Sequence, residues 1–275
     1  MFPEPHRQFP VLPGNTTCMK QKDLALISIT LLLVIVVLAS DPVPQDPGYH
    51  DFADQRTVLG MPNAYNVLSN ELFVFIGAWG AAFTLQFLRS GSNTVLMIQY
   101  FLFFAGVFLT GLGSSYYHYA PSNQTMLWDR LPMSIAFMAL LSSVITECVD
   151  RKTGAFLLAP LVVLGIFSVL YWVWTENRGL GDLRPYILVQ FLPVVLIPII
   201  LLLYQPAKQY AAPVWALTTL YVVAKVFEIF DQQLYVITGI VSGHTVKHIL
   251  AAAGTGVVLI MLYARRNEMA SARIA

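Results

Sequence analysis

The chain has 275 residues, of which 57% are hydrophobic and 11% are charged, and its formal net charge at pH 7 is +1. An ordinary soluble domain carries about 25% charged residues, so the composition excludes a soluble globular domain. The near-neutral charge gives no support for a nucleic-acid partner, and two cysteines are too few for a disulfide framework. Apolar runs long enough to cross a bilayer, about 20 residues each, predict a polytopic membrane protein.

In chain order, these runs predict eight transmembrane spans. All should be helices, because a lipid-exposed backbone must satisfy its own hydrogen bonds. The predicted spans are Leu24–Ser40, Val67–Leu88, Val95–His118, Leu127–Glu147, Gly154–Thr175, Arg184–Tyr204, Ala212–Asp231 and Gly243–Arg265. The predicted fold class is all-α: a polytopic transmembrane helical bundle of seven core helices plus an additional N-terminal hydrophobic helix.

The predicted domain organisation is one membrane domain with short flanking segments. Residues 1–23 form a Pro-rich tail that we expect to be disordered. Residues 24–40 are either a signal peptide or an uncleaved anchor, and the long polar lead favours the anchor. A loop, residues 41–66, precedes the seven-helix domain, residues 67–265, and residues 266–275 form a C-terminal tail. No internal repeat supports the inverted-repeat plan of many transporters, and no protein partner is inferred.

The basic residues predict the orientation in the membrane. Ten lie on the side that holds the N-terminus: Arg7, Lys20, Lys22, Arg89, Arg151, Lys152, Lys208, Arg265, Arg266 and Arg273. Four lie on the other side: Arg56, Arg130, Arg178 and Arg184. This imbalance places both termini in the cytoplasm, where Cys18 and Cys148 should stay reduced.

Five chemically informative residues fall at one depth on the non-cytoplasmic side. The third span ends at His118, and Ser114 lies one turn deeper on the same face. Asp129 lies near the start of the next span. His244 opens the last span, and His248 lies one helical turn further on the same face. We therefore expect these side chains to converge in the outer half of the bundle.

Three imidazoles at one level favour a metal site over isolated interfacial histidines. Three neutral imidazoles leave a tetrahedral zinc ion with one position for water, as in catalytic rather than structural zinc sites. Asp129 could exchange the proton of that water, and Ser114 could donate to an oxyanion. Asp129 could instead form a salt bridge, and Ser114 could be a small residue for helix packing. The residues themselves predict a zinc-dependent hydrolase that acts on a lipid-like ester or amide.

Further polar residues share this depth. Asn66, Ser69, Asn70 and Glu71 begin the second span. Lys225, Glu228 and Asp231 end the seventh, with a spacing that predicts one helical face. Ionisable groups in a membrane suggest function by default, and we interpret this second set as an internal ion pair or as outer partners of the histidines.

The ordered motifs resemble those of the alkaline ceramidase family. They are Asn66-Val67-Leu68-Ser69-Asn70, Ser114 with His118, Asp129 eleven residues later, and His244 with His248. The resemblance spans roughly Tyr49 to Arg265. The amino-acid sequence around His118 and Asp129 is most similar to that of the bacterial-type branch. That family lies in the seven-helix membrane hydrolase superfamily that includes the adiponectin receptors.

The resemblance implies a hydrolase with zinc on His118, His244 and His248, and with Ser114 and Asp129 as catalytic partners. The implied reaction is cleavage of the ceramide amide to a sphingoid base and a fatty acid by a zinc-bound water. Ceramide or a similar long-chain amide would then be the lipid substrate, held in a site towards the non-cytoplasmic side.

The resemblance also implies a candidate calcium site before the first core helix. Asp51, Asp54 and Asn63 match part of it, whereas Arg56 stands where an oxygen ligand is expected. From composition alone, the acidic cluster is either a solvated loop or an oxygen-ligand calcium site.

Two other classes of function remain open from the sequence. One is a seven-helix receptor with a structural or ligand-linked zinc ion, although the short cytoplasmic loops argue against a coupling partner. The other is an ion-coupled transporter that uses Lys225, Glu228 and Asp231, for which charged pairs should extend towards the cytoplasmic half.

Overall fold

A computed structural model of the chain describes residues 19–89 and 94–271, and these residues form helices without any strand of a sheet. Eight candidate membrane spans are present, as predicted. They are α1 (Met19–Ala39), α2 (Ala64–Leu68) with α3 (Glu71–Arg89), α4 (Thr94–Tyr119), α5 (Asn123–Cys148), α6 (Arg151–Glu176), α7 (Arg184–Tyr204), α8 (Lys208–Ile229) and α10 (Gly243–Ser271). The predicted all-α polytopic bundle is confirmed, and the chain is a multi-pass membrane protein.

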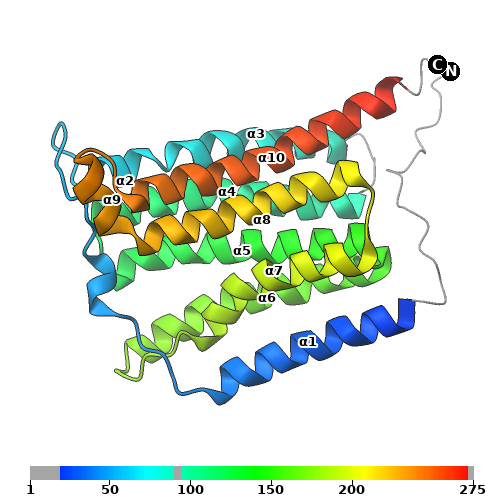
Figure 1. Cartoon of the computed structure of the whole chain (residues 1–275), viewed down its shortest axis with the longest axis horizontal. Coiled ribbons are helices and arrows are strands. Elements are labelled where there is room, and N and C mark those ends of the chain that lie inside the picture. Colours follow the sequence, from blue (N-terminus) through cyan, green and yellow to red (C-terminus); the bar gives the residue numbers. More distant parts are fainter. Residues whose placement is uncertain (1–18, 90–93, 272–275) are drawn as a thin grey trace.

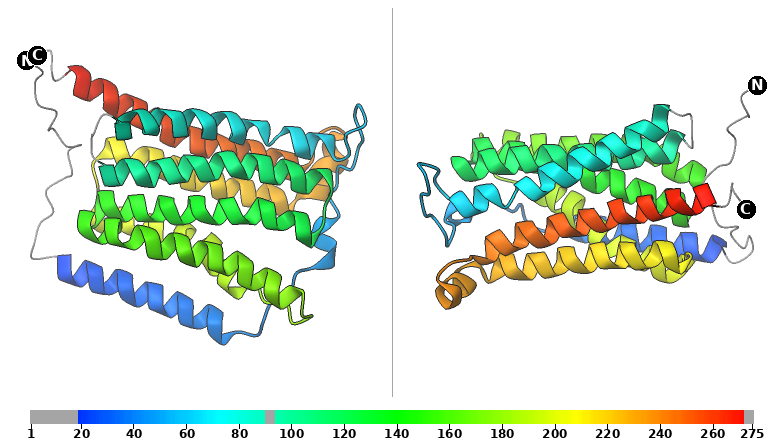
Figure 2. Two further views of the ribbon diagram at one scale, coloured as in Figure 1. Left: turned by 180° about the vertical axis from the view of Figure 1, so that it is seen from behind. Right: turned by 90° about the horizontal axis from the view of Figure 1, so that it is seen from above.

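The long helices run side by side along one direction, and the short elements gather at one end (Figures 1 and 2). That end, which we call the loop end, comprises residues 41–66 and α9 (Asp231–Thr238). The loop segment includes the short helix η1 (Pro47–His50) and leads into α2. The loop end is also where α4 ends and where α5 and α10 begin, so it collects the polar residues that the sequence placed at one depth.

Helix α5 lies at the centre of the bundle and α1 lies at its edge. In the most apolar stretch of each helix, 72% of the residues are buried in α5 and none in α1. Helix α1 packs against α7, and Arg184 at the start of α7 donates to the carbonyl oxygen of Leu38 at 3.0 Å. The helix begins at Met19, so residues 19–23 belong to a helix rather than to the tail expected there. Residues 1–18, including Cys18, lie outside the described residues.

The chain turns between Glu228 and Asp231, where a single helical face was predicted. Helix α8 ends at Ile229, Phe230 leaves the helical conformation with φ −95° and ψ 28°, and Asp231 opens α9. The prediction is therefore wrong for Asp231, which does not share a helix with Lys225 and Glu228. Its carboxylate accepts backbone N–H groups from two other segments instead.

Candidate active site

Three buried histidines meet at the loop end. His118 lies at the end of α4, and His244 and His248 lie in the first turns of α10. One nitrogen from each ring lies within 4.8 Å of the other two. The Nε2 atoms of His118 and His244 are 3.2 Å apart, and all three side chains are at most 5% exposed. The predicted convergence of these rings is what the structure shows.

The start of α10 is fixed by a close helix contact and by a carboxylate. A Cβ atom at Gly243 would lie 2.0 Å from the carbonyl oxygen of Phe227, so only glycine permits this approach of α10 to α8. The next residue, His244, donates its backbone N–H to Asp231 at 2.7 Å. A carboxylate at this position satisfies one of the free N–H groups at the helix start. Local backbone contacts therefore set the direction of the His244 side chain.

The other two histidines are held by the residues that flank α2, Asn63 before it and Ser69 after it. Ser69 Oγ lies 2.8 Å from His248 Nδ1, which leaves Nε2 of that ring for the centre of the site. Asn63 donates its side-chain N–H to the backbone carbonyl of His118 at 2.9 Å. Partners of this kind orient the ring of a ligating histidine. The sequence placed Ser69 at the correct depth without identifying its partner.

Phe52 covers the histidines on the loop side. Its ring centroid lies 4.5 Å from that of His118 and 4.8 Å from that of His244. The side chain is buried, and Phe52 also borders a polar surface pocket together with Gln55 and Gln232. The apolar ring thus separates the histidines from that pocket. Phe52 was not singled out from the sequence; an aromatic residue inside an acidic loop was the available signal.

Ser114 and Asp129 are brought together across α4 and α5. The Ser114 hydroxyl lies close enough to the Asp129 carboxylate to interact with it. Their helices approach closely because a Cβ atom at Gly113 would lie 1.8 Å from the carbonyl oxygen of Trp128. Pro132 has no N–H to donate to the residue four positions earlier, which is Trp128. Glycine and proline therefore set the spacing that pairs Ser114 with Asp129.

A cluster of charged residues borders the histidines. Glu228 forms ion pairs with both Lys225 and Lys247, and the Lys247 nitrogen lies 2.9 Å from Glu228 Oε1. The same nitrogen lies 3.2 Å from His244 Nε2. The predicted association of Lys225 and Glu228 with the histidines is therefore correct, with Lys247 as the intermediary that the sequence did not indicate.

The candidate calcium ligands do not form a common site. Asp54 is buried and pairs with Arg56 through both carboxylate oxygens, at 2.8 and 2.6 Å. These hydrogen bonds raise the pKa of the Arg56 guanidinium above its usual value. The guanidinium also donates to the carbonyl oxygen of Ile240. An arginine thus supplies the positive charge that a calcium ion would bring to Asp54.

The other two candidate calcium ligands face different partners. Asp51 accepts a hydrogen bond from Gln55 at 2.6 Å. Asn63 uses its side-chain N–H on His118, as described above. The three residues therefore do not fit a calcium ion, which needs six to eight oxygen ligands at 2.3–2.6 Å.

The histidine cluster does fit a zinc ion by its chemistry. Facing imidazole nitrogens 3.2 Å apart can share only one proton. Among the described residues, no carboxylate belongs to this ligand cluster. Three neutral imidazoles are also the ligand set of a catalytic zinc site with one open position. The donor set is therefore compatible with zinc.

Comparison with protein-family models decides the family. Residues 61–273 match the model described as Ceramidase. The chain belongs to the ceramidase family. Membership makes it a hydrolase that acts on amide bonds, and it confirms the resemblance inferred from the ordered motifs. The matched segment includes all three histidines, Ser114 and Asp129. A search of curated proteins found no match to the chain.

Proposed function

We propose that the chain is a zinc-dependent lipid amide hydrolase that works inside the membrane and cleaves ceramide to a sphingoid base and a fatty acid. The observation that carries the proposal is the position of three buried histidine nitrogens beside the Ser114–Asp129 pair. Membership of the ceramidase family supplies the reaction class. The same geometry gives each polar side chain a role.

His118, His244 and His248 would hold the ion. When bound there, zinc supplies a Lewis acid that polarises an amide carbonyl and makes water more acidic. Asp129 is the proton carrier: it takes a proton from water and returns it to the amine that leaves. Ser114 donates its hydroxyl to the oxygen of the former carbonyl as negative charge develops there.

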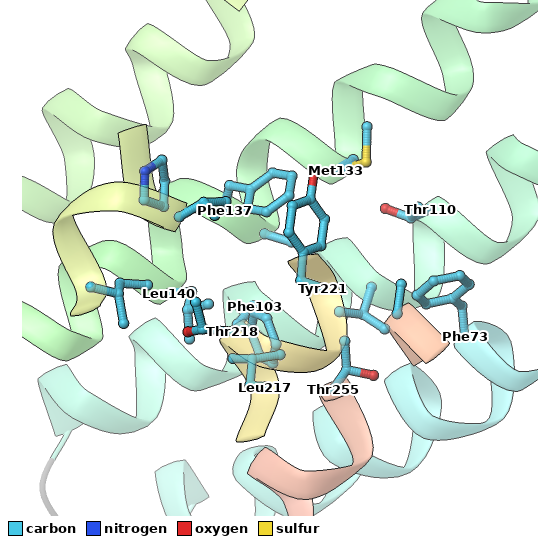
Figure 3. Close-up of a pocket in the computed structure, with 16 residues that line it drawn as sticks. Phe73, Phe103, Thr110, Met133, Phe137, Leu140, Leu217, Thr218, Tyr221 and Thr255 are labelled. Carbon is cyan, nitrogen blue, oxygen red and sulfur yellow. The ribbon is translucent and has the colours of Figure 1, made fainter. Parts of the chain in front are cut away.

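An apolar cavity lies inside the bundle, one to two helical turns from the reactive residues along the same helices, and supports a lipid substrate (Figure 3). Thr110 lies one turn from Ser114 on α4, Met133 one turn from Asp129 on α5, and Thr255 two turns from His248 on α10. The three helices that carry the reactive residues therefore also line the cavity. Phe73 joins the two regions, because it lines the cavity and its ring centroid lies 6.5 Å from that of His248.

The cavity suits an acyl chain in a defined orientation. Its lining is mainly aliphatic and aromatic, with Phe103, Phe137 and Leu217 among the residues that project into it (Figure 3). Burying an apolar chain there contributes roughly 0.8 kcal/mol per methylene group. An acyl chain in this cavity would place its amide carbonyl at the level of the histidines.

The charge distribution favours hydrolysis over ion-coupled transport. Glu147 pairs with Arg265 at the end opposite the loop end, so charged groups are present at both ends of the bundle. Between them lies the apolar cavity lined by residues such as Leu140 and Ile197. A transported ion would have to cross this mainly apolar section, whose lining offers a few hydroxyl groups and no charged side chain, at high cost. The positive-inside prediction, with both termini cytoplasmic, leaves the loop end on the non-cytoplasmic side.

A hydrolysis assay with a panel of lipids tests the proposal. Purified protein in lipid nanodiscs is incubated with ceramides, long-chain amides and long-chain esters, and the products are quantified by mass spectrometry with and without a zinc chelator. We expect release of a fatty acid and a sphingoid base that stops on chelation and returns on addition of zinc. Absence of cleavage in protein shown to contain zinc would reject the hydrolase assignment.

A further inference from the structure

A buried arginine beside the reactive pair has no function assigned so far. Arg130 follows Asp129 on α5 and is 5% exposed. It belongs to none of the ion pairs among the described residues, and its Nη1 atom is buried without a hydrogen-bond partner. Arginine keeps its charge in proteins and offers five N–H donors. A buried charge without an acceptor is costly, so this arrangement requires an explanation.

Aromatic rings surround the guanidinium, yet none of them is a hydrogen-bond partner of its Nη1 atom. Its central carbon lies 4.5 Å from the Trp172 ring, 4.8 Å from the Tyr186 ring and 5.5 Å from the Tyr49 ring. Cation–π contacts stabilise the charge, yet the Nη1 hydrogens remain unpaired. The indole nitrogen of Trp172 is likewise buried without a partner. We call the Arg130 guanidinium and the surrounding rings of Trp172, Tyr186 and Tyr49 the Arg130 box. The two unpaired donors in this box indicate a site for a group that brings acceptor oxygens.

This box is adjacent to the reaction site. The charge of Arg130 acts on Asp129 and on Tyr117. Tyr117 packs in the same buried cluster as Phe52, and Phe52 contacts the His118 ring. The ring centroid of Tyr117 also lies 4.9 Å from that of His118. A group bound by Arg130 would therefore be separated from the histidines by the Tyr117 side chain.

Tyr49 connects the box to the second charged cluster. Its ring faces Arg130, and its hydroxyl donates to Glu228 at 3.4 Å. Glu228 in turn pairs with Lys247 beside His244. Around the reaction site the cations Lys225, Lys247 and Arg130 equal in number the carboxylates Asp129, Glu228 and Asp231. Lys225 and Lys247 both pair with Glu228, whereas Arg130 is in none of the ion pairs among the described residues. Arg130 is therefore the cation that remains for an anionic group.

The position of the box relative to the apolar cavity shows which part of a substrate would reach it. The cavity lies one to two helical turns from the reactive residues, deeper in the bundle, and suits the acyl chain. The Arg130 box lies among α5, α6, α7 and η1 at the loop end, where Tyr49 is 38% exposed. The polar, amine-bearing half of an acyl amide would occupy this end.

We propose that Arg130 binds a carboxylate carried by the amine half of the substrate, so that N-acylated amino acids are substrates of this site. The proposal rests on the amide hydrolase function proposed above. A guanidinium binds a carboxylate through two parallel hydrogen bonds, which would satisfy the donors left free in the box. Cleavage adds water across the amide bond, and the products are a fatty acid and a free amino acid.

A matched pair of substrates tests the proposal. N-oleoylglycine and N-oleoylglycinamide differ only in the charged carboxylate, and the released glycine and glycinamide are quantified by mass spectrometry. We expect wild-type protein to favour the acid over the amide by roughly tenfold or more in kcat/KM, the usual scale of a charge-assisted hydrogen bond. In Arg130→Met the ratio should fall to about one, and Arg130→Lys should retain part of the preference.

A control variant tests whether the loss of any arginine that stacks on an aromatic ring changes the acid-to-amide ratio. Arg178 is exposed and also stacks on an aromatic ring: the central carbon of its guanidinium lies 4.3 Å from the centroid of the Trp174 ring. Arg178→Met should keep the wild-type ratio. Zinc content and thermal midpoint are measured for each variant. Because the ratio compares two substrates on the same protein, a partly unfolded fraction does not change it.

Binding without turnover gives a readout independent of catalysis. N-oleoylglycine should bind Asp129→Asn protein at least tenfold more tightly than it binds the Asp129→Asn/Arg130→Met double variant. Equal ratios in wild type and Arg130→Met would overturn the proposal while leaving amide hydrolysis intact. If zinc-loaded wild-type protein cleaves neither ceramide nor the two probes, the proposed function itself fails.

Discussion

The carboxylate of Asp231 accepts the backbone N–H of His244 at 2.7 Å, and its second oxygen accepts the backbone N–H of Ala53 at 2.9 Å. One side chain therefore fixes the start of α10, which carries two histidines, and the loop that places Phe52 over them. The end of the molecule that carries the histidines depends on this connection. Asp231 acts through the backbone of His244 rather than through its ring.

Replacement of Asp231 by asparagine should weaken both connections. Asparagine has one acceptor oxygen and no charge, so we expect a loss of about 1–3 kcal/mol in unfolding free energy. Zinc affinity should fall by roughly 10- to 100-fold, as for partners that orient metal ligands. Thermal unfolding and competition with a zinc chelator measure the two effects. Asp51→Asn is the control, because Asp51 contacts only an exposed glutamine; equal losses in both variants would contradict the specific role of Asp231.

Removal of a histidine should remove the metal. His248→Ala leaves two of the three imidazoles, and we expect the zinc content to fall from about one per chain to near zero, together with hydrolysis. Ser69→Ala removes only the partner of His248 Nδ1 and should lower zinc affinity by about 10- to 100-fold. Ser115→Ala, whose hydroxyl contacts the carbonyl of Val67, serves as the matched control. Full zinc content in His248→Ala, measured by metal analysis, would exclude the histidine cluster as the zinc site.

Asp129 and Ser114 should affect turnover without affecting metal content. Asp129→Asn cannot carry the proton, and we expect kcat to fall by about 10²- to 10⁴-fold. Ser114→Ala should lower kcat by about 10²- to 10³-fold through loss of an oxyanion donor. Because the two side chains interact and act in the same reaction, the double variant should lose less than the product of the single losses. Undiminished hydrolysis by Asp129→Asn would remove this carboxylate from the mechanism.

The close approach of α4 to α5 should tolerate no side chain at Gly113. A Cβ atom there would lie 1.8 Å from a backbone oxygen, so Gly113→Ala should separate the helices, lower the thermal midpoint and slow hydrolysis by displacing Ser114 from Asp129. The control is Gly256→Ala on α10, where a Cβ atom meets only a side-chain carbon of Ile76 at 3.4 Å. That variant should be neutral or gain up to about 1 kcal/mol from higher helix propensity. Equal thermal midpoints for the two variants would show that the helices can separate at no cost.

Calcium should have no effect on this chain. Arg56 already pairs with the buried carboxylate of Asp54, so a calcium-selective chelator should leave the thermal midpoint and the rate of hydrolysis of the wild type unchanged. Arg56→Gln should lower the thermal midpoint, because Asp54 then lacks its cation. A lower midpoint of the wild-type protein after calcium removal would show that an ion binds at this loop after all.

The sequence by itself determined the class of fold, the common depth of the three histidines in the helical bundle, and the family. Hydropathy sets the number of spans, because each apolar run must cross a hydrocarbon layer of fixed thickness. Helical periodicity places His244 and His248 on one face, and Ser114 and His118 on another. These are local properties of the chain, and the structure bears them out.

Only the tertiary structure decided which side chains meet across helices. The turn at Phe230 that moves Asp231 out of α8, the burial of Arg130 among three aromatic rings, and the pairing of Asp54 with Arg56 join segments that are distant in sequence or hidden by loop geometry. Hydropathy and periodicity carry no information on such contacts, since they depend on helix rotation and close packing. Gly113 and Gly243 illustrate this. Neither position has room for a side chain, because a backbone oxygen of a neighbouring helix lies too close.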